Sequence, residues 1–308
     1  MRLVIFTEPQ LGASYADQVR AARTTEECGF EGYFRSDHYL TMGGDGLPGP
    51  TDSWVTLGGL ARETSRVRLG TLVTSATFRH PGPLAISVAQ VDEMSGGRVE
   101  LGIGAGWYEA EHQAYAIPFP PVGERFDRLT EQLEIITSLW TVPEGERYSY
   151  SGRHYQVVDS PGLPKPAQRP RPPIIIGGSG PKRTPALAAR FADEFNVPFR
   201  SAAEAARIYR NVDDACVLAG RTDLPVKSAA VTVVCGRTDA EVRERWGGEV
   251  RDTDSGSGAV IGTPARVVDE LGAYAEAGAT RLFLQMRDLR DTDLIELIAA
   301  EVAPQLPR

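Results

Sequence analysis

The sequence predicts an α/β protein: a single (β/α)8 TIM barrel over residues 1–308, with insertions at its C-terminal face. Short β-branched runs alternate eight times with amphipathic stretches, which is typical of βα units built on a parallel sheet. The chain has 308 residues, enough for eight such units in one domain. A doubly wound sheet of similar length is the alternative.

The predicted strands are the β-branched and aromatic runs, in order 3–6, 32–36, 67–74, 99–103, 173–176, 195–197, 228–234 and 281–284. The predicted helices are 14–28, 52–64, 83–94, 123–140, 181–191, 202–219, 239–246, 263–277 and 291–302. Their ends carry ordinary signals. Ser14 is an N-cap and Gly29 a C′ residue, while Thr263 followed by Pro264 reads as an N-cap with proline at N1.

Two segments interrupt this rhythm. Residues 143–172 contain an alternating stretch, 148–157, that predicts a small hairpin followed by a proline-rich run. Residues 247–258 are rich in Gly, Asp and Ser and predict a mobile loop. We expect such insertions to shape the mouth of the barrel, where barrel enzymes keep their active sites.

Composition excludes several functions. With 41 acidic and 33 basic residues the net charge is -8, which argues against nucleic acid as a partner. No apolar stretch approaches ~20 residues, so we expect no membrane partner. The three cysteines and four histidines are isolated in sequence, which predicts no metal site. Isolated cysteines and an N-terminus without a signal-peptide pattern predict a cytoplasmic protein.

Polar side chains follow the predicted strands at the end where barrels bind ligands. Asp37 and His38 follow the second strand, and a histidine there can exchange protons near neutral pH. Ser75, Thr77 and Phe78 follow the third strand, where two hydroxyls and an aromatic ring suit a polar planar ligand.

Two glycine-rich runs follow later strands. The run 102–106 has the spacing GxGxG, which lets another surface approach the backbone closely but does not match the dinucleotide fingerprint. The run Gly177, Gly178, Ser179, Gly180 precedes Pro181 and a predicted helix. Free backbone N–H groups at a helix N-terminus favour an anion, so this run predicts a phosphate site. A phosphate anchor beside polar and aromatic groups favours a bound organic cofactor.

The order of these motifs resembles the luciferase-like monooxygenase superfamily, and more narrowly its branch that uses the deazaflavin coenzyme F420. The resemblance spans nearly the whole chain and is carried by residues 35–38, 68–74, 96–107, 124–129, 164–166 and 177–180. It implies a barrel with the flavin-like ring in its mouth, and a homodimer as the usual assembly.

The resemblance also implies residue roles. Asp37 would contact the cofactor, and His38 would face the substrate as the proton donor or acceptor. A non-proline cis peptide bond would fall at Leu72–Val73, behind the ring. Ser75 and Thr77 would hydrogen-bond the ring edge or the ribityl chain. The cofactor phosphate would lie on Gly177, Gly178, Ser179 and Gly180.

The sequence departs from the F420-dependent sugar-phosphate dehydrogenases of this family. Trp107 stands where they carry a glutamate, and Met42 and glycines stand where they carry a tryptophan, which casts doubt on a sugar phosphate substrate. Trp107 and Phe78 are candidate apolar walls of the substrate pocket. Glu109 and Glu111 are further candidate acids.

The predicted function is hydride transfer between F420 and a small organic substrate. An FMN-dependent monooxygenase or reductase on the same barrel is one alternative, and a non-catalytic relative that binds the cofactor is another. F420 carries a lactate and glutamate tail beyond its phosphate and so calls for more basic groups than FMN. The available ones are Lys182, Arg183, Arg79 and Arg125.

Overall fold

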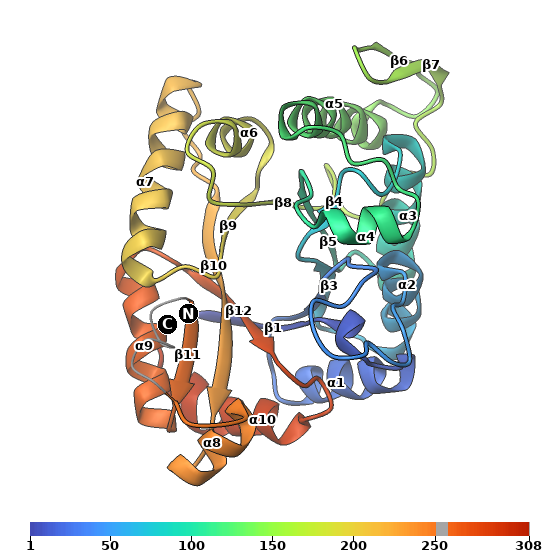
Figure 1. The fold of residues 1–308 in the computed structure, drawn as a ribbon. Coiled ribbons are helices and arrows are strands. Elements are labelled where there is room, and N and C mark those ends of the chain that lie inside the picture. The colour runs from blue at the N-terminus through green and yellow to red at the C-terminus, as the bar shows by residue number, and fades with distance from the viewer. Residues whose placement is uncertain (251–257, 308) are drawn as a thin grey trace.

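The computed structural model describes residues 1–250 and 258–307, and within them eight parallel strands close into the predicted barrel. Around the barrel they are β1 (Arg2–Thr7), β2 (Gly32–Arg35), β3 (Arg68–Thr71), β5 (Val99–Gly104), β8 (Ile174–Gly177), β9 (Glu194–Pro198), β10 (Val226–Cys235) and β12 (Arg281–Met286). β1 pairs with both β2 and β12, and β9 pairs with β10, so no strand of this ring is left as an edge. Figure 1 shows the helices as an outer ring around these strands.

The helices match the predicted ones to within a few residues at each end. They are α1 (Tyr15–Glu27), α2 (Ser53–Glu63), α3 (Pro81–Ser95), α5 (Val122–Thr141), α6 (Arg183–Phe191), α7 (Ala202–Leu218), α8 (Asp239–Trp246) and α9 (Pro264–Glu276). Ser14 caps α1 as predicted, with its side chain accepting from the backbone N–H of Asp17 in a capping box. Thr263 precedes α9, with Pro264 at its first turn, although the Thr263 hydroxyl makes no capping bond.

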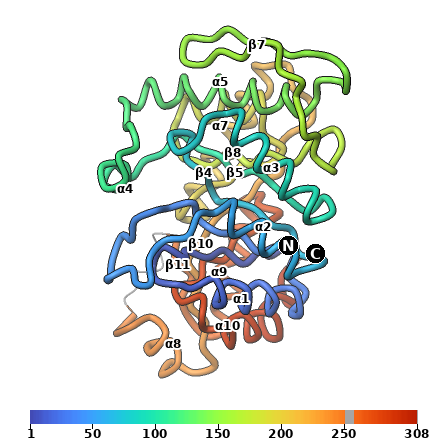
Figure 2. Tube along the Cα trace, turned by 90° about the vertical axis from the view of Figure 1, so that its right-hand side faces the viewer, coloured from blue at the N-terminus to red at the C-terminus, as the bar shows by residue number. Residues whose placement is uncertain are grey.

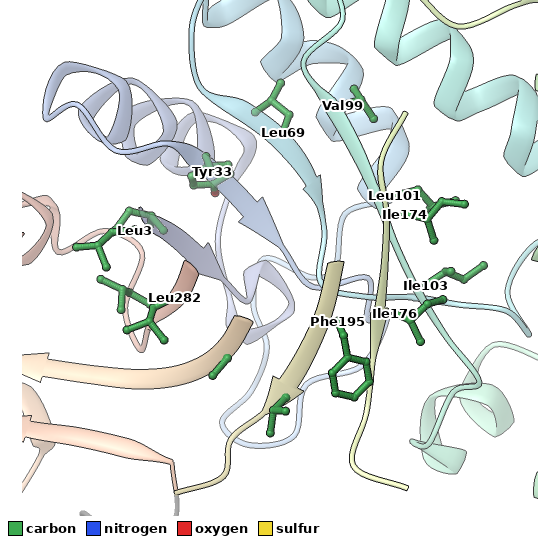
Figure 3. Close-up of a cluster of buried hydrophobic side chains, with 14 of the residues drawn as sticks. Leu3, Tyr33, Leu69, Val99, Leu101, Ile103, Ile174, Ile176, Phe195 and Leu282 are labelled. Atoms are coloured by element: carbon green, nitrogen blue, oxygen red, sulfur yellow. The ribbon is translucent and has the colours of Figure 1, made fainter. Parts of the chain in front are cut away.

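Alternation along each strand separates two apolar layers. Leu3, Ile174 and Leu282 point outward and pack under the helices, as Figure 3 shows for ten labelled residues of this layer. Their neighbours point into the barrel and fill it: Val4, Phe6, Phe34, Ile175, Ala230 and Phe283. Leu72 and Phe199, which follow β3 and β9, pack on this inner cluster from the mouth side. The barrel interior is therefore a packed floor on which a ligand can rest, not a pore.

The structure corrects the predicted elements in four places. The strand predicted over 67–74 is interrupted, giving β3 and a short β4 (Thr74–Ser75). A short helix α4 (Glu109–Ala114) and a strand β11 (Ala259–Gly262), which extends the sheet beside the end of β10, were not predicted. The last predicted helix, 291–302, is α10 (Thr292–Leu297) followed by a π-helical turn (Ile298–Val302).

The predicted hairpin exists as β6 (Tyr148–Ser151) and β7 (Gln156–Ser160). It follows α5 rather than a barrel strand and lies over that helix at one end of the molecule (Figure 2). Glu131 of α5 accepts hydrogen bonds from the backbone N–H groups of residues 153–155, and the Tyr150 hydroxyl donates to Glu134 at 2.8 Å. The segment 105–121, which contains α4, instead contacts residues that follow barrel strands, through Glu111 to His38 and His112 to Thr77.

The loop predicted to be mobile, 247–258, lies mostly outside the described residues, which resume at Gly258. Gly258 has a φ of +84°, and a Cβ there would come within 2.4 Å of the backbone of Phe199. Only glycine fits this close approach, because it has no side chain and tolerates positive φ.

Candidate active site

The end of β2 is held by a buried ion-pair cluster. The carboxylate of Asp37, which is 2% exposed, binds Arg79 with an Oδ2–Nη1 distance of 2.5 Å. The same guanidinium reaches Asp52 at 2.5 Å and the Tyr39 hydroxyl at 2.8 Å. Asp52 also caps α2 through the backbone N–H groups of Trp54 and Val55. Burial opposes ionisation of Asp52, but the charge of Arg79 together with hydrogen bonds from the Val55 N–H, Arg79 and the Tyr39 hydroxyl outweighs burial and lowers the pKa of that carboxyl.

This cluster fixes the position of His38. Arg79 already binds the Asp37 carboxylate. The cofactor contact that the resemblance implies for Asp37 would therefore use either its backbone or a carboxylate oxygen that Arg79 also binds. Two charge-assisted bonds to a planar guanidinium hold the β2 loop in one geometry.

His38 is paired with a carboxylate. Its Nδ1 lies 3.0 and 3.1 Å from the two oxygens of Glu111, which comes from α4 and is 1% exposed. Glu111 also accepts from the backbone N–H of Tyr39 at 3.0 Å. A carboxylate only accepts, so Nδ1 of His38 carries the hydrogen and Nε2 has a lone pair in the neutral ring. Within the described residues no protein group bonds Nε2, and the side chain is 16% exposed.

Aromatic side chains flank this histidine. Trp107 meets the His38 ring edge-on at 5.8 Å between centroids, and Tyr108 does so at 6.2 Å. The two aromatic rings stack on each other at 5.2 Å, and Trp107 is 64% exposed. The structure thus places Trp107 beside His38, and its role as an apolar wall of a substrate pocket stays a prediction.

Phe78, the second predicted wall, lies elsewhere. It packs on Tyr39 at 4.8 Å and on His112 at 5.1 Å. It lines a cavity of about 640 Å³ between the β4–α3 loop, residues 116–120 and α5, whose lining includes neither His38 nor Trp107. The structure thus does not bring the two predicted walls together.

Sequence reasoning missed Glu8, which directly follows β1. Its carboxylate accepts from Gln285 Nε2 at 2.5 Å, and Gln285 in turn accepts from the Thr232 hydroxyl at 2.5 Å. Burial raises the pKa of the Glu8 carboxyl, while the nearby His38 acts to lower it. The signal was available, because Glu8 stands at a strand end in the same way as Asp37 and His38.

The cis peptide bond predicted at Leu72–Val73 is present. It turns the chain between β3 and β4, and the Val73 methyl groups lie against three glycines of neighbouring strands. A Cβ would come within 3.1 Å of Val73 at Gly102 and Gly104, and within 3.3 Å at Gly177. The GxGxG run therefore makes room for this bulge, which explains its glycines without a dinucleotide.

Ser75 and Thr77 form a chain of hydrogen bonds with His112, a residue that sequence reasoning did not place in the site. Ser75 Oγ lies 2.6 Å from Thr77 Oγ1, which lies 2.6 Å from His112 Nε2. The carbonyl of Tyr108 lies 2.7 Å from His112 Nδ1 and can only accept, so Nδ1 carries the hydrogen. Nε2 of the neutral ring then accepts from Thr77, and Thr77 accepts from Ser75. The free lone pairs of Ser75 suit a ligand group that donates.

The predicted phosphate loop leaves its N–H groups largely free. Gly178, with φ of +146°, donates to Asn196 at 3.1 Å, but no described residue accepts from the N–H of Ser179 or Gly180. The loop leads into α6, a nine-residue helix whose N-terminus adds a positive dipole end. These donors fit a phosphate group.

Of the four basic candidates, three are already engaged. Arg79 binds Asp37 and Asp52, Arg125 donates to the carbonyl of Pro120, and Arg183 binds Asp127 and the carbonyl of Gly123. Lys182, beside the phosphate loop, is exposed and has no hydrogen-bonding or ion-pair partner in the part of the chain that the structure describes.

In residues 1–250 and 258–307, no group of three or more His, Cys, Asp or Glu side chains is arranged to hold a metal ion. None of the helices there combines the length and apolar character that crossing a membrane requires.

Comparisons with known proteins show a family match and several relatives. The family model described as luciferase-like monooxygenase matches residues 1–246. An F420-dependent glucose-6-phosphate dehydrogenase of Microbacterium testaceum (strain StLB037) is 39% identical over 64% of this chain, but the match spans only 57% of that relative. An uncharacterized protein of Mycobacterium tuberculosis (strain ATCC 25618 / H37Rv) is 30% identical over 91% of this chain and 97% of its own.

A solved structure, an F420-dependent secondary alcohol dehydrogenase in complex with an F420–acetone adduct, superposes with a TM-score of 0.86 over 100% of this chain and 99% of the other. At 18% identity this likeness shows the same fold.

Proposed function

The chain belongs to the luciferase-like monooxygenase family, and from that premise we propose that it is an oxidoreductase that transfers a hydride between the deazaflavin coenzyme F420 and a small organic substrate. The observation that carries the proposal is the pairing of a free phosphate loop, Ser179–Gly180, with an oriented proton-transfer group, His38, at the same end of the barrel. Relatives named as F420-dependent dehydrogenases support the choice of coenzyme.

The chain's own residues would hold the cofactor from both ends. The N–H groups of Ser179 and Gly180, with Lys182 beside them, would bind the phosphate. The bulge at Leu72–Val73 would support one face of the ring, and Ser75 would accept a hydrogen bond from the ring edge or ribityl chain. When bound, F420 donates or accepts a hydride at C5 of its ring.

His38 would hold or move the proton that accompanies the hydride. Glu111 fixes the hydrogen on Nδ1, which leaves Nε2 to take a proton from a substrate hydroxyl or, when protonated, to give one to a carbonyl oxygen. Arg79, Asp37 and Asp52 keep the loop that carries His38 in place. Trp107 and Tyr108 shield one side of the imidazole from water.

The proposal is tested by titrating the protein with F420 and, separately, with FMN, following fluorescence or absorbance. We expect saturable F420 binding and weaker FMN binding. Tight FMN binding without F420 binding would overturn the proposal in favour of an FMN enzyme. Binding of F420 without turnover of any substrate would favour a non-catalytic relative.

A homodimer and a cytoplasmic location are part of the same proposal; the dimer rests on the family resemblance alone and the location on the isolated cysteines. A mass in solution equal to one chain would contradict the dimer.

A further inference from the structure

We infer that the substrate side of the mouth, beside His38, takes an uncharged alcohol or carbonyl compound with an apolar or aromatic body and excludes phosphorylated or carboxylated substrates. This inference rests on the proposed function and adds the substrate class to it.

The first argument is charge. Three carboxyl groups lie near His38: Glu111 binds it, Glu8 interacts with its charge, and Asp37 precedes it in the chain, sharing Arg79 with Asp52. Two guanidiniums accompany them, and both are committed: Arg79 binds Asp37 and Asp52, while the buried Arg35 donates to Thr51, Thr56 and the carbonyl of Ser36. Within the described residues, neither of these two guanidiniums is therefore free to receive an anion beside His38.

The contrast with the phosphate loop sharpens this point. There the chain offers two free N–H groups, a helix N-terminus and the ammonium of Lys182. We therefore assign the phosphate loop to the cofactor phosphate. A second phosphate, on the substrate, would lie among carboxyl groups without a counter-ion, which is costly in a partly buried site.

The second argument is shape and polarity. Trp107 presents a large exposed aromatic face next to His38, backed by the stacked ring of Tyr108. An indole exposed to this extent gains most by covering an apolar or aromatic body. Trp107 also disfavours a sugar phosphate as substrate, because an indole offers one N–H donor and no charge.

The reaction that fits is the interconversion of an alcohol and its carbonyl compound. In the oxidising direction the carbinol C–H bond would break and its hydrogen would leave with the electron pair as hydride to bound F420, while Nε2 of His38 would take the hydroxyl proton and the C=O double bond would form. The alcohol loses two electrons and F420 gains them, so no further oxidant is needed.

The test uses the protein loaded with F420 and matched substrates that differ by one carboxylate group. Benzyl alcohol and 4-carboxybenzyl alcohol are assayed with oxidised F420, the corresponding aldehydes with reduced F420, and glucose 6-phosphate alongside them. We expect kcat/KM for the neutral compound to exceed that of its carboxylate by about tenfold or more, and no turnover of glucose 6-phosphate. Equal rates, a preference for the anions, or no turnover of the neutral compounds by protein with F420 bound would overturn the inference.

A variant pair isolates the role of Trp107. Trp107→Arg supplies the missing cation beside His38, and Trp107→Leu keeps the position apolar. We expect Trp107→Arg to raise the preference for the carboxylated compound about tenfold relative to Trp107→Leu. An unchanged ratio in Trp107→Arg would show that this position does not contact the substrate and would overturn the inference. Failure of the unsubstituted protein to bind F420 at all would instead remove the proposed function.

Discussion

Buried charges occupy both ends of the barrel, but they are used differently. At the N-terminal end Arg281, 1% exposed, binds Glu100 at 2.6 Å and Glu194 at 2.7 Å. Burial alone lowers the pKa of a guanidinium, yet these carboxylates raise the pKa of Arg281 above its ordinary value. Arg281 thus pairs with both carboxylates, and Arg68 also binds Glu100.

At the C-terminal mouth the carboxylates instead orient groups that stay open. Glu111 is as buried as Arg281, but it holds His38, which is 16% exposed and has an unbonded ring nitrogen. Next to it Trp107 is 64% exposed. The two ends thus teach that burial of charge does not by itself mark a functional site. A functional site is indicated instead when a buried charge orients a neighbouring side chain whose reactive atom stays accessible, as Glu111 does for His38.

The largest expected difference between the ends comes from His38→Ala. Loss of a general acid–base group lowers kcat about 10²- to 10⁴-fold, and we expect F420 affinity to stay unchanged. Steady-state kinetics and F420 titration check this. His80→Ala, an exposed histidine lining the other cavity, is the control and should keep full activity. Undiminished turnover in His38→Ala would remove His38 from proton transfer.

Arg281→Met tests the opposite end. Removing the cation leaves Glu100 and Glu194 buried without a partner, so we expect a loss of about 3–5 kcal/mol in the free energy of unfolding, measured with urea. Arg2→Met is the matched control, because its pair with Glu31 is exposed and contributes about 0–1 kcal/mol. Equal effects of the two substitutions on the free energy of unfolding would contradict the stabilising role of the Arg281 cluster.

Glu111→Gln tests whether the mouth uses its buried carboxylate for orientation. A hydrogen bond to a charged group contributes about 1.5–3 kcal/mol, so its loss should lower kcat about 10- to 100-fold while KM changes little. Glu109→Gln, two residues away and exposed, should leave kcat unchanged. A fall in Tm without a fall in kcat would show that Glu111 stabilises the fold, like the buried ion pairs at the N-terminal end of the barrel, and does not orient His38.

The smallest effect concerns Glu26, at the C-terminal end of α1. Burial opposes ionisation of its carboxyl, but backbone N–H groups of Arg66, Val67 and Ser65 outweigh burial and lower the pKa from 4.5 to about 2. Because the folded-state pKa is lowered, this stabilisation is full above pH 4.5 and is lost as the pH falls toward 2.

Glu26→Gln should therefore cost about 1–2 kcal/mol at pH 7, with the difference from the unsubstituted protein shrinking on acidification. Urea unfolding at several pH values measures it, with the exposed neighbour Glu27 replaced by Gln as control. A difference that grows as the pH falls would contradict the sign.

Much of the fold could be predicted because it follows from local patterns. All eight barrel strands were predicted from runs such as residues 3–6 and 281–284, which alternate between helix-facing and barrel-facing side chains. α4 was missed because it has six residues, of which Glu109, Ala110, Gln113 and Ala114 are exposed, so it shows no apolar periodicity. β11 was missed because its four residues abut a Gly-, Asp- and Ser-rich stretch.

The candidate site was predictable as a set of strand ends but not as a set of partners. The sequence placed Asp37, His38 and Ser179 at one end of the barrel, and the structure agrees. It could not show that Arg79, 42 residues from Asp37, occupies that carboxylate, or that Glu111, 73 residues from His38, orients the imidazole. Such pairings depend on how loops cross the mouth, which no local pattern encodes.

The central claim is that the backbone N–H groups of Ser179 and Gly180 bind the phosphate of the cofactor, and that this contact positions the deazaflavin ring over the barrel mouth. The most direct measurement compares the dissociation constants of F420 and of the same deazaflavin riboside without phosphate and tail. Charge-assisted hydrogen bonds of about 1.5–3 kcal/mol each predict at least about tenfold tighter binding of F420. Equal affinity for the two compounds would contradict the claim.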